Sequence, residues 1–143
     1  MPRTTNKITT RAEYEACRAA GIDVLGGRYD VPIGLRVELQ RELFGTGHTP
    51  AENEKFYRYC WEHKRQICEE CMKPLRSYSA VFVSHILTRG AHPEMAHDPR
   101  NVNILCLRHH NQWENGNRKA MRIYAANQLT IEELKREYGA DKI

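Results

Sequence analysis

The chain has 143 residues, of which 41% are hydrophobic, and its formal net charge is +4. This length allows one modest core and leaves little room for a second independent domain. No stretch approaches the roughly 20 consecutive apolar residues that span a bilayer, and the amino-terminal residues lack the apolar region of a secretory signal. The sequence therefore predicts a small protein of the cytoplasm.

Residues 1–48 are predicted to form a helical amino-terminal extension. Thr10 and Glu13 have the spacing of a capping box, which predicts a short helix over residues 11–20. Leucines spaced four residues apart predict a second helix over residues 33–44. No pattern in this part of the chain indicates a chemical site.

The next helix has the clearest start signal. Residues 49–52 combine a cap residue, a proline at the first helical position and a glutamate at the third, and the helix is expected to run to about His63. Its aromatic side chains fall on one apolar face. We interpret them as core residues rather than as a platform for nucleobases: Phe56, Tyr57 and Trp61.

Two strands and a helix are predicted after this point. A run of β-branched and aromatic residues over 79–86 predicts the first strand, and residues 101–105 predict the second. The stretch between them, residues 88–99, contains proline, glycine and histidine and is predicted to be a loop. Residues 106–115 then predict a helix that ends before a glycine.

Residues 126–143 are assigned to a carboxy-terminal helix packed on the same domain. Residues 130–133 form another capping box, so this helix is expected to run from there to Tyr138. Together with the extension of residues 1–48 and a central domain over residues 49–125, the pattern predicts a small α+β protein.

The cysteines form a recognisable ligand pattern. Cys68-x2-Cys71 and Cys106-x2-His109 supply two short-spaced pairs of soft ligands, one on a turn and one at a helix start. This arrangement predicts a closed structural zinc site of the treble-clef type. His110 is an alternative to His109 as the fourth ligand. The two remaining thiols are interpreted as core residues: Cys17 and Cys60.

Three pieces of the sequence follow one another in a specific order. The zinc pair at residues 68–71 precedes the strand-borne histidine of residues 83–86, and residues 101–110 then bring an asparagine, the second zinc pair and an immediate histidine. In this order, over residues 62–116, the chain resembles the HNH endonucleases of the ββα-metal superfamily. The resemblance implies a zinc-stapled treble-clef ββα-metal core within the domain at residues 49–125. It also implies a DNA phosphodiester hydrolase that leaves 5′-phosphate and 3′-hydroxyl ends.

The resemblance also assigns roles to single residues. Phosphodiester hydrolysis needs a base for water and a cation for the charge on phosphate. His85 matches the general base, Asn101 the residue that orients it, and His110 the ligand of the catalytic divalent ion. Asn103 competes with Asn101, although the distance to the second zinc pair favours Asn101. Glu114, one helical turn after His110, is a candidate second ligand, with a solvated helix glutamate as the alternative.

One position departs from the family pattern. Many members have an aspartate directly before the base, where it binds the metal, but this chain has Ser84. A hydroxyl is a poor ligand for Mg²⁺. Either Glu114 or Asp98 compensates, or the ion is held by His110 and substrate oxygens. The identity of the catalytic ion, Mg²⁺, Mn²⁺, Ni²⁺ or Zn²⁺, is therefore left open.

Basic residues bracket the motif. Residues 61–125 hold ten Lys and Arg against six Asp and Glu, a difference equal to the net charge of the whole chain. Such a segment suits a polyanionic partner. We expect phosphate contacts from the following residues, each of which has an ordinary surface position as its alternative: Arg89, Arg100, Arg108, Arg118, Lys119 and Arg122.

The expected partner is DNA, duplex or branched, and not a membrane. The small size suggests a nonspecific cutter or one guided by a partner protein, as in phage or mobile-element nucleases, and double-strand cleavage would call for a homodimer or two visits. Two other functions stay open. One is a non-catalytic zinc-finger module that binds nucleic acid, and the other is a protein-interaction finger, which gives the basic segment no purpose.

Overall fold

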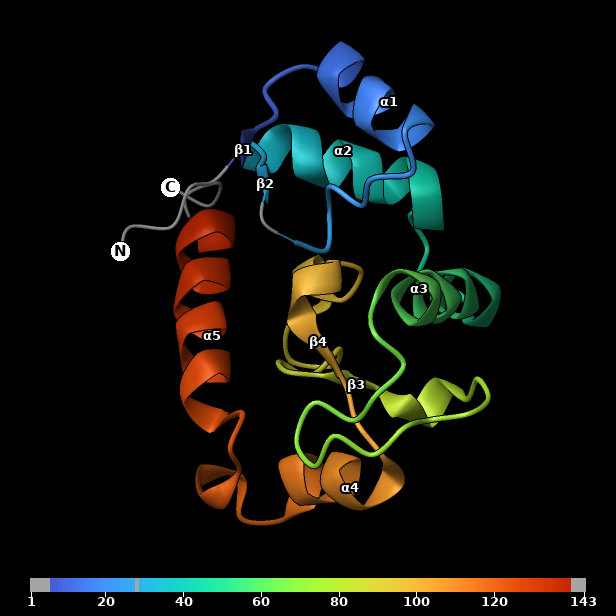
Figure 1. Cartoon of the computed structure of the whole chain (residues 1–143). Coiled ribbons are helices and arrows are strands. Elements are labelled where there is room, and N and C mark those ends of the chain that lie inside the picture. The colour runs from blue at the N-terminus through green and yellow to red at the C-terminus, as the bar shows by residue number, and fades with distance from the viewer. Residues whose placement is uncertain (1–5, 28, 140–143) are drawn as a thin grey trace.

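The computed structural model describes residues 6–27 and 29–139 (Figure 1). Helices and a few short strands make up these residues, so the predicted α+β class is confirmed. None of the helices in these ranges is both long and apolar enough to cross a membrane. The outer limits of the predicted extension and of the predicted terminal helix, residues 1 and 143, lie outside the described residues.

The amino-terminal extension contains the two predicted helices, α1 (Arg11–Ala19) and α2 (Ile33–Phe44). The capping box at Thr10 forms as predicted. A short parallel pair, β1 (Asn6–Lys7) and β2 (Tyr29–Asp30), was not predicted. These elements enclose a small apolar cluster of their own: Ile8, Tyr14, Val24, Leu25, Val31 and Leu39.

Helix α3 (Pro50–His63) joins the extension to the central domain. The predicted cap is confirmed, since the Thr49 hydroxyl accepts a hydrogen bond from the backbone of Glu52. At the end of α2, the ring of Phe44 packs edge-on against Phe56 of α3, with 5.2 Å between centroids. Both rings are buried, so the extension shares the main core with the central domain.

The centre of the molecule is a ββα unit. Strand β3 (Val83–His85) pairs antiparallel with β4 (Val102–Ile104), and α4 (Leu107–Asn115) follows (Figure 1). The first strand is shorter than the predicted 79–86, because β4 offers only three partner residues and residues 80–82 turn into a 3-10 helix. The indole of Trp113, buried on α4, donates to the Ile86 carbonyl at 3.1 Å and fixes the helix to the strand.

Helix α5 (Tyr124–Gly139) stands along one side of the molecule, from the level of α4 to that of α2 (Figure 1). The predicted start at Thr130 is wrong. Thr130 lies inside the helix, where its hydroxyl donates to the Ala126 carbonyl at 3.2 Å. The helix starts earlier because the amide of Asn127, buried one turn before, exchanges hydrogen bonds with Asn103 of β4 at 2.8 and 3.2 Å.

Candidate metal centre and catalytic cleft

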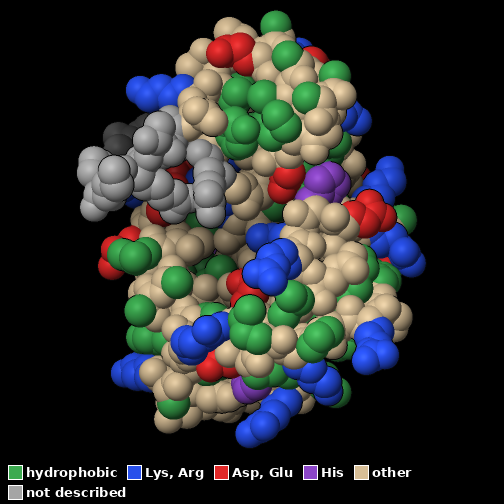
Figure 2. Space-filling model, in the orientation of Figure 1, with side chains coloured by type: hydrophobic (Ala, Val, Ile, Leu, Met, Phe, Trp, Pro, Cys, Tyr) green, Lys and Arg blue, Asp and Glu red, His purple; other side chains and the backbone are tan. Residues whose placement is uncertain are grey.

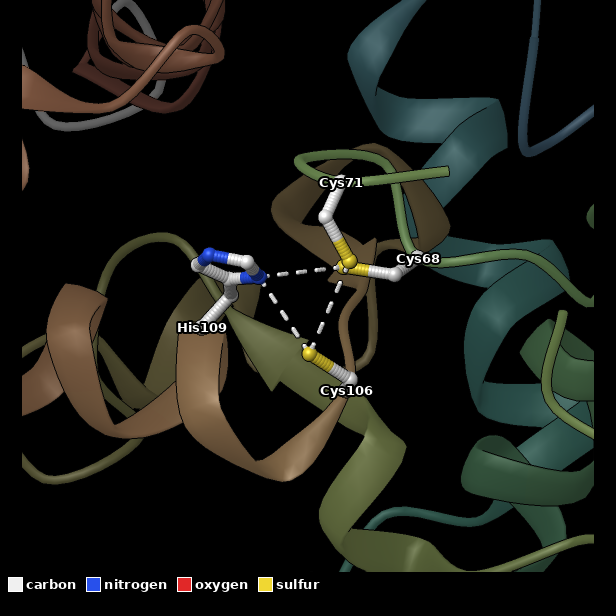
Figure 3. A group of neighbouring side chains, drawn as sticks. All are labelled: Cys68, Cys71, Cys106 and His109. Atoms are coloured by element: carbon white, nitrogen blue, oxygen red, sulfur yellow. Dashed lines mark hydrogen bonds between the residues drawn. The ribbon is translucent and has the colours of Figure 1, made fainter. Parts of the chain in front are cut away.

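The four predicted zinc ligands come together at one point (Figure 3). The sulfurs of Cys68, Cys71 and Cys106 and a ring nitrogen of His109 all lie within 4.8 Å of one another. Nδ1 of His109 is 3.2 Å from the Cys106 sulfur and 3.6 Å from that of Cys68. A tetrahedral ion with bonds of about 2.0–2.3 Å would set such atoms about 3.5–3.8 Å apart. The cluster can therefore hold one metal ion.

Local backbone structure presents these ligands. The Cys68 amide donates to the Lys73 carbonyl at 2.9 Å, and the Met72 amide donates back to the Cys68 carbonyl at 2.8 Å, which folds residues 68–73 into a tight turn. Met72 takes the left-handed conformation (φ 64°) that this turn requires. Cys106 is the residue directly before α4, so Cys106 and His109 lie within the first helical turn.

The electrostatics of the cluster favour a thiolate at Cys68, whereas burial and the neighbouring Cys68 and Cys71 side chains raise the pKa of Cys106. Burial by itself would raise the pKa of Cys68, but backbone N–H groups of Cys106, Cys71 and Glu70 and the ring of His109 outweigh it and lower the pKa to about 7. A thiolate is the form that binds metal ions. The ligand turn is thus prepared for a cation.

A second feature is a cleft of about 840 Å³ that side chains from α3, β3, the following loop and α4 line. It brings together four of the predicted site residues, His85, Arg89, His110 and Glu114. The complete lining consists of His48, Asn53, Tyr57, Ala80, Val81, Val83, His85, Thr88, Arg89, Gly90, Pro93, His110 and Glu114.

His85 is held in one tautomer. Its Nε2 lies 2.8 Å from the carbonyl oxygen of Ala96, and since that oxygen can only accept, Nε2 carries the hydrogen and Nδ1 is the basic nitrogen. Burial lowers the pKa of His85 to about 4, although the Ala96 carbonyl opposes this, and the charges of Arg89 and His110 lower it further. The ring is therefore neutral at pH 7.

Asn101 does not face the cleft but ties together the loop that shapes it. The side chain is fully buried, accepts from the Leu87 amide at 2.8 Å, and donates to the carbonyls of Leu87 and Met95 at 3.0 and 3.2 Å. Its competitor Asn103 is engaged elsewhere, with Glu69 and Asn127. The carbonyl that anchors His85, on Ala96, follows directly after Met95. Asn101 thus holds the two sides of the loop at a fixed separation beside the histidine.

Ser84 contacts the histidine expected to bind the catalytic ion. Its buried hydroxyl lies 2.9 Å from Nδ1 of His110. Because this contact engages Nδ1, only Nε2 of the ring is available to another ligand. Glu114 is half-buried one helical turn further along α4.

Two predictions for charged residues do not suit the structure. Asp98, a suggested metal ligand, is fully buried and bound by Arg36 at 3.3 Å, Arg100 at 2.8 Å and the Tyr138 hydroxyl at 2.9 Å. Arg100, a suggested phosphate contact, is only 11% exposed and also pairs with Glu137 at 2.9 Å. Both residues are occupied by this internal cluster, so neither is available to a metal ion or to DNA.

The other predicted phosphate contacts are scattered. Arg89 lines the cleft, but Arg118 lies over the Trp113 ring at 4.5 Å and Arg122 donates to a backbone carbonyl. Arg108 and Lys119 are exposed outside the cleft lining. On the face drawn in Figure 2, Lys and Arg side chains are spread over the surface with Asp and Glu among them rather than gathered in one patch. Only Arg89 stands beside the predicted base.

Among the cleft residues that were not predicted are three from α3 and the segment before it: His48, Asn53 and Tyr57. Nothing in the sequence marks the first two. Tyr57 was assigned to the core with its aromatic neighbours, but it is half-buried and its outer surface faces the cleft. Helical periodicity could not separate it from the buried rings, because it lies at the edge of the apolar face.

Comparisons of the chain with models of protein families, with curated proteins and with solved structures each found no match.

Proposed function

We propose that this protein is a metal-dependent endonuclease of the HNH type that hydrolyses DNA phosphodiester bonds with His85 as the general base. The observation that carries the proposal is the anchored tautomer of His85, whose Nε2–H donates to the Ala96 carbonyl at 2.8 Å. A general base at neutral pH must be unprotonated and must keep its basic nitrogen free. The buried, neutral ring meets both conditions, and it lines an open cleft.

The chemistry follows from the ring. Nδ1 of His85 takes a proton from a water molecule as the water adds to phosphorus, and the bond from phosphorus to the 3′ oxygen breaks. The Ala96 carbonyl, which accepts from Nε2, stabilises the positive charge that the ring acquires. Arg89, on the same cleft wall, binds the phosphate. His85 afterwards releases its proton to solvent, and the 3′ oxygen takes one up.

A catalytic divalent ion would be held by His110 and Glu114, whose side chains line the cleft with His85. In the part of the chain that the structure describes, the cluster at Cys68 is the only group of three or more His, Cys, Asp or Glu ligands. The cleft therefore supplies two protein ligands at most, and water and substrate oxygens complete the set. Such an ion would neutralise charge on the phosphate and the leaving oxygen.

We further propose that the metal ion of the four-ligand cluster is zinc. Three sulfurs and one imidazole nitrogen are the donor set of closed structural zinc sites, and soft thiolates disfavour Mg²⁺ and Ca²⁺. This ion would have no part in the reaction, because all four of its positions are filled by protein.

Cleavage of supercoiled plasmid tests the function. Wild type, His85→Ala and His92→Ala are compared with Mg²⁺, Mn²⁺, Ni²⁺ or EDTA, and His92 is the control because it lies in the loop that follows β3 but outside the cleft lining. We expect metal-dependent nicking in wild type and His92→Ala and its loss in His85→Ala, with zinc content and melting transition unchanged. Retained nicking in His85→Ala would refute the assignment of the base. Binding without cleavage under any ion would favour the non-catalytic nucleic-acid module.

A further inference from the structure

Tyr57 has an outer surface that the fold does not use. It is half-buried on α3, and its ring stands edge-on to that of His85 with 6.1 Å between centroids. Among the described residues its hydroxyl has no hydrogen-bond partner, whereas those of Tyr59, Tyr78 and Tyr138 are bound to carboxylates. A tyrosine hydroxyl that is removed from water usually finds a partner. The free hydroxyl therefore indicates that this ring meets solvent or a ligand inside the cleft.

Arg89 lies over this ring, and among the described residues its charge is uncompensated. Its guanidinium carbon is 5.9 Å from the centre of the Tyr57 ring, and within the described ranges no carboxylate forms an ion pair with it. The chain contains a similar pair for comparison, in which Arg58 lies 4.4 Å from the ring centre of Tyr78. There, Glu54 pairs with Arg58 at 3.8 Å and accepts from the Tyr78 hydroxyl at 2.6 Å. The pair in the cleft has no such carboxylate.

Apolar side chains also line the cleft. They are Ala80, Val81 and Val83, of which Val81 is 45% exposed. An aromatic ring, apolar side chains and an unpaired guanidinium in one cleft together match one nucleotide, whose base is flat and apolar on its faces and whose phosphate is anionic. In an intact duplex the faces of each base are covered by its neighbours and cannot reach such a surface.

We infer that Tyr57, Val81 and Arg89 bind an unpaired nucleotide next to the scissile phosphate, so that the substrate of this cleft is DNA with at least one unpaired base at the cut. Calling this DNA a substrate rests on the proposed nuclease function. The contact with an unpaired nucleotide does not depend on that function. Tyr57 stacks on the base, Val81 covers its edge, and Arg89 holds the adjoining phosphate. Because the Tyr57 ring lies edge-on to that of His85, the unpaired nucleotide would lie beside the histidine that activates water.

Binding of two matched probes tests the contact without cleavage. One is a single-stranded DNA oligonucleotide carrying 2-aminopurine, and the other is its fully paired duplex, both measured without added divalent ions. Because stacking on one aromatic residue contributes about 1–3 kcal/mol, we expect Tyr57→Leu to weaken single-strand binding by about fivefold to 150-fold and to abolish quenching of 2-aminopurine. The same variant should change affinity for the duplex by about twofold at most, since the faces of paired bases are covered by their neighbours.

Control variants separate stacking from folding. Tyr57→Phe keeps the ring and should bind both probes like wild type. Tyr78→Leu removes the ring of the comparison pair and should also leave both affinities unchanged. Arg89→Ala should weaken both probes and lower the salt dependence of binding, because its partner is a phosphate. Equal loss of both probes in Tyr57→Leu, or no loss of either, with an unchanged melting transition would overturn the inference.

Cleavage of paired substrates separates this inference from the proposed function. If the protein is a nuclease, an oligonucleotide with one unpaired base should be cut faster than the fully paired duplex of the same sequence, and Tyr57→Leu should remove the difference. Equal cleavage of both substrates by wild type would overturn the inference while His85-dependent cutting still supported the nuclease. Absence of all cutting would refute the nuclease function but not the nucleotide contact. Binding of the two probes would then show whether Tyr57 contacts an unpaired base.

Discussion

Replacing Asp98 by asparagine should destabilise the protein far more than replacing Arg36 by methionine, although the two side chains form one ion pair. Both are fully buried, 3.3 Å apart. Asp98→Asn leaves the Arg36 guanidinium charged in the interior with neutral acceptors alone, namely the Leu25 carbonyl at 2.7 Å and the new amide oxygen. Leaving one charge of a buried pair without its partner costs about 3–5 kcal/mol.

Arg36→Met has a different outcome because Asp98 keeps other partners. Arg100 at 2.8 Å and the Tyr138 hydroxyl at 2.9 Å still bind its carboxylate. The substitution also removes two guanidinium nitrogens, Nε and Nη2 of Arg36, that are buried without a hydrogen-bond partner among the described residues. Methionine fills much of the same volume, so we expect a loss of about 2 kcal/mol or less.

Urea denaturation of the metal-loaded protein, followed by circular dichroism, measures the free energy of unfolding that each variant loses. Thermal unfolding followed by the same signal measures the change in melting temperature. For a domain of this size 1 kcal/mol corresponds to about 2–4 °C, so Asp98→Asn should lower the melting temperature by roughly 6–20 °C. The double variant should be more stable than Asp98→Asn, since it no longer buries an unpaired guanidinium. Equal losses in the two single variants, or a double variant less stable than either, would refute the reasoning.

Three further predictions concern the metal cluster, the loop and the buried histidines. Cys68→Ala should lose both the bound metal and cooperative unfolding, while the half-buried Cys17→Ala keeps both in metal analysis and calorimetry; a metal-loaded Cys68→Ala would contradict this. Asn101→Ala leaves the N–H and the carbonyl of Leu87 without partners, removes one of the two donors to the Met95 carbonyl, and should cost about 2–4 kcal/mol in denaturant titration; a loss within the error of measurement would count against it. His85 and His97 have their pKa lowered to about 4 from 6.5, chiefly by burial, so folding favours their neutral forms. Their contribution is complete above pH 6.5 and is lost as the pH falls toward 4, so stability should already decline between pH 6.5 and 5, and a flat profile there would be inconsistent with burial.

Features set by neighbours in sequence could be predicted. The capping boxes at Thr10 and Thr49 each need one hydroxyl and one glutamate three residues later, and both form. The ligand turn and the first turn of α4 are equally local, so the spacing of Cys68 and Cys106 from their partners was sufficient to predict a four-ligand cluster. What the spacing could not supply is how the 34 residues between Cys71 and Cys106 fold to bring the two pairs of ligands together.

Features set by distant partners could not be predicted. Thr130 has the same local pattern as the other two caps, but the exchange between Asn127 and Asn103 keeps the chain helical through it. The sequence predicts a surface position for Arg100, but the carboxylates of Asp98 and Glu137 bind it inside the protein. Charge and periodicity identify the type of residue and not its partner.

The cleft also combines features that the sequence predicts with features that depend on distant residues. The family order predicts a general base at His85, which stays a prediction, whereas the tautomer of this ring depends on a carbonyl eleven residues later, at Ala96. Tyr57 entered the core prediction because it shares an apolar helix face with Trp61, and only the packing reveals that it is half-buried and lines the cleft. Both facts arise from how the loop after β3 closes over α3.

Two adjacent histidines on α4 connect the metal centre to the cleft. His109 directs Nδ1 at the cysteine sulfurs, 3.2 Å from that of Cys106, while Nδ1 of His110 contacts the Ser84 hydroxyl at 2.9 Å. Successive residues of a helix point about 100° apart, so one helical turn serves both sites. Release of the ion would free the start of α4 from the Cys68 turn, and the Trp113 and Ser84 contacts would be left to hold His110 against the strand. Occupancy of the four-ligand site should therefore restrain the cleft wall formed by α4 even though the two sites share no ligand.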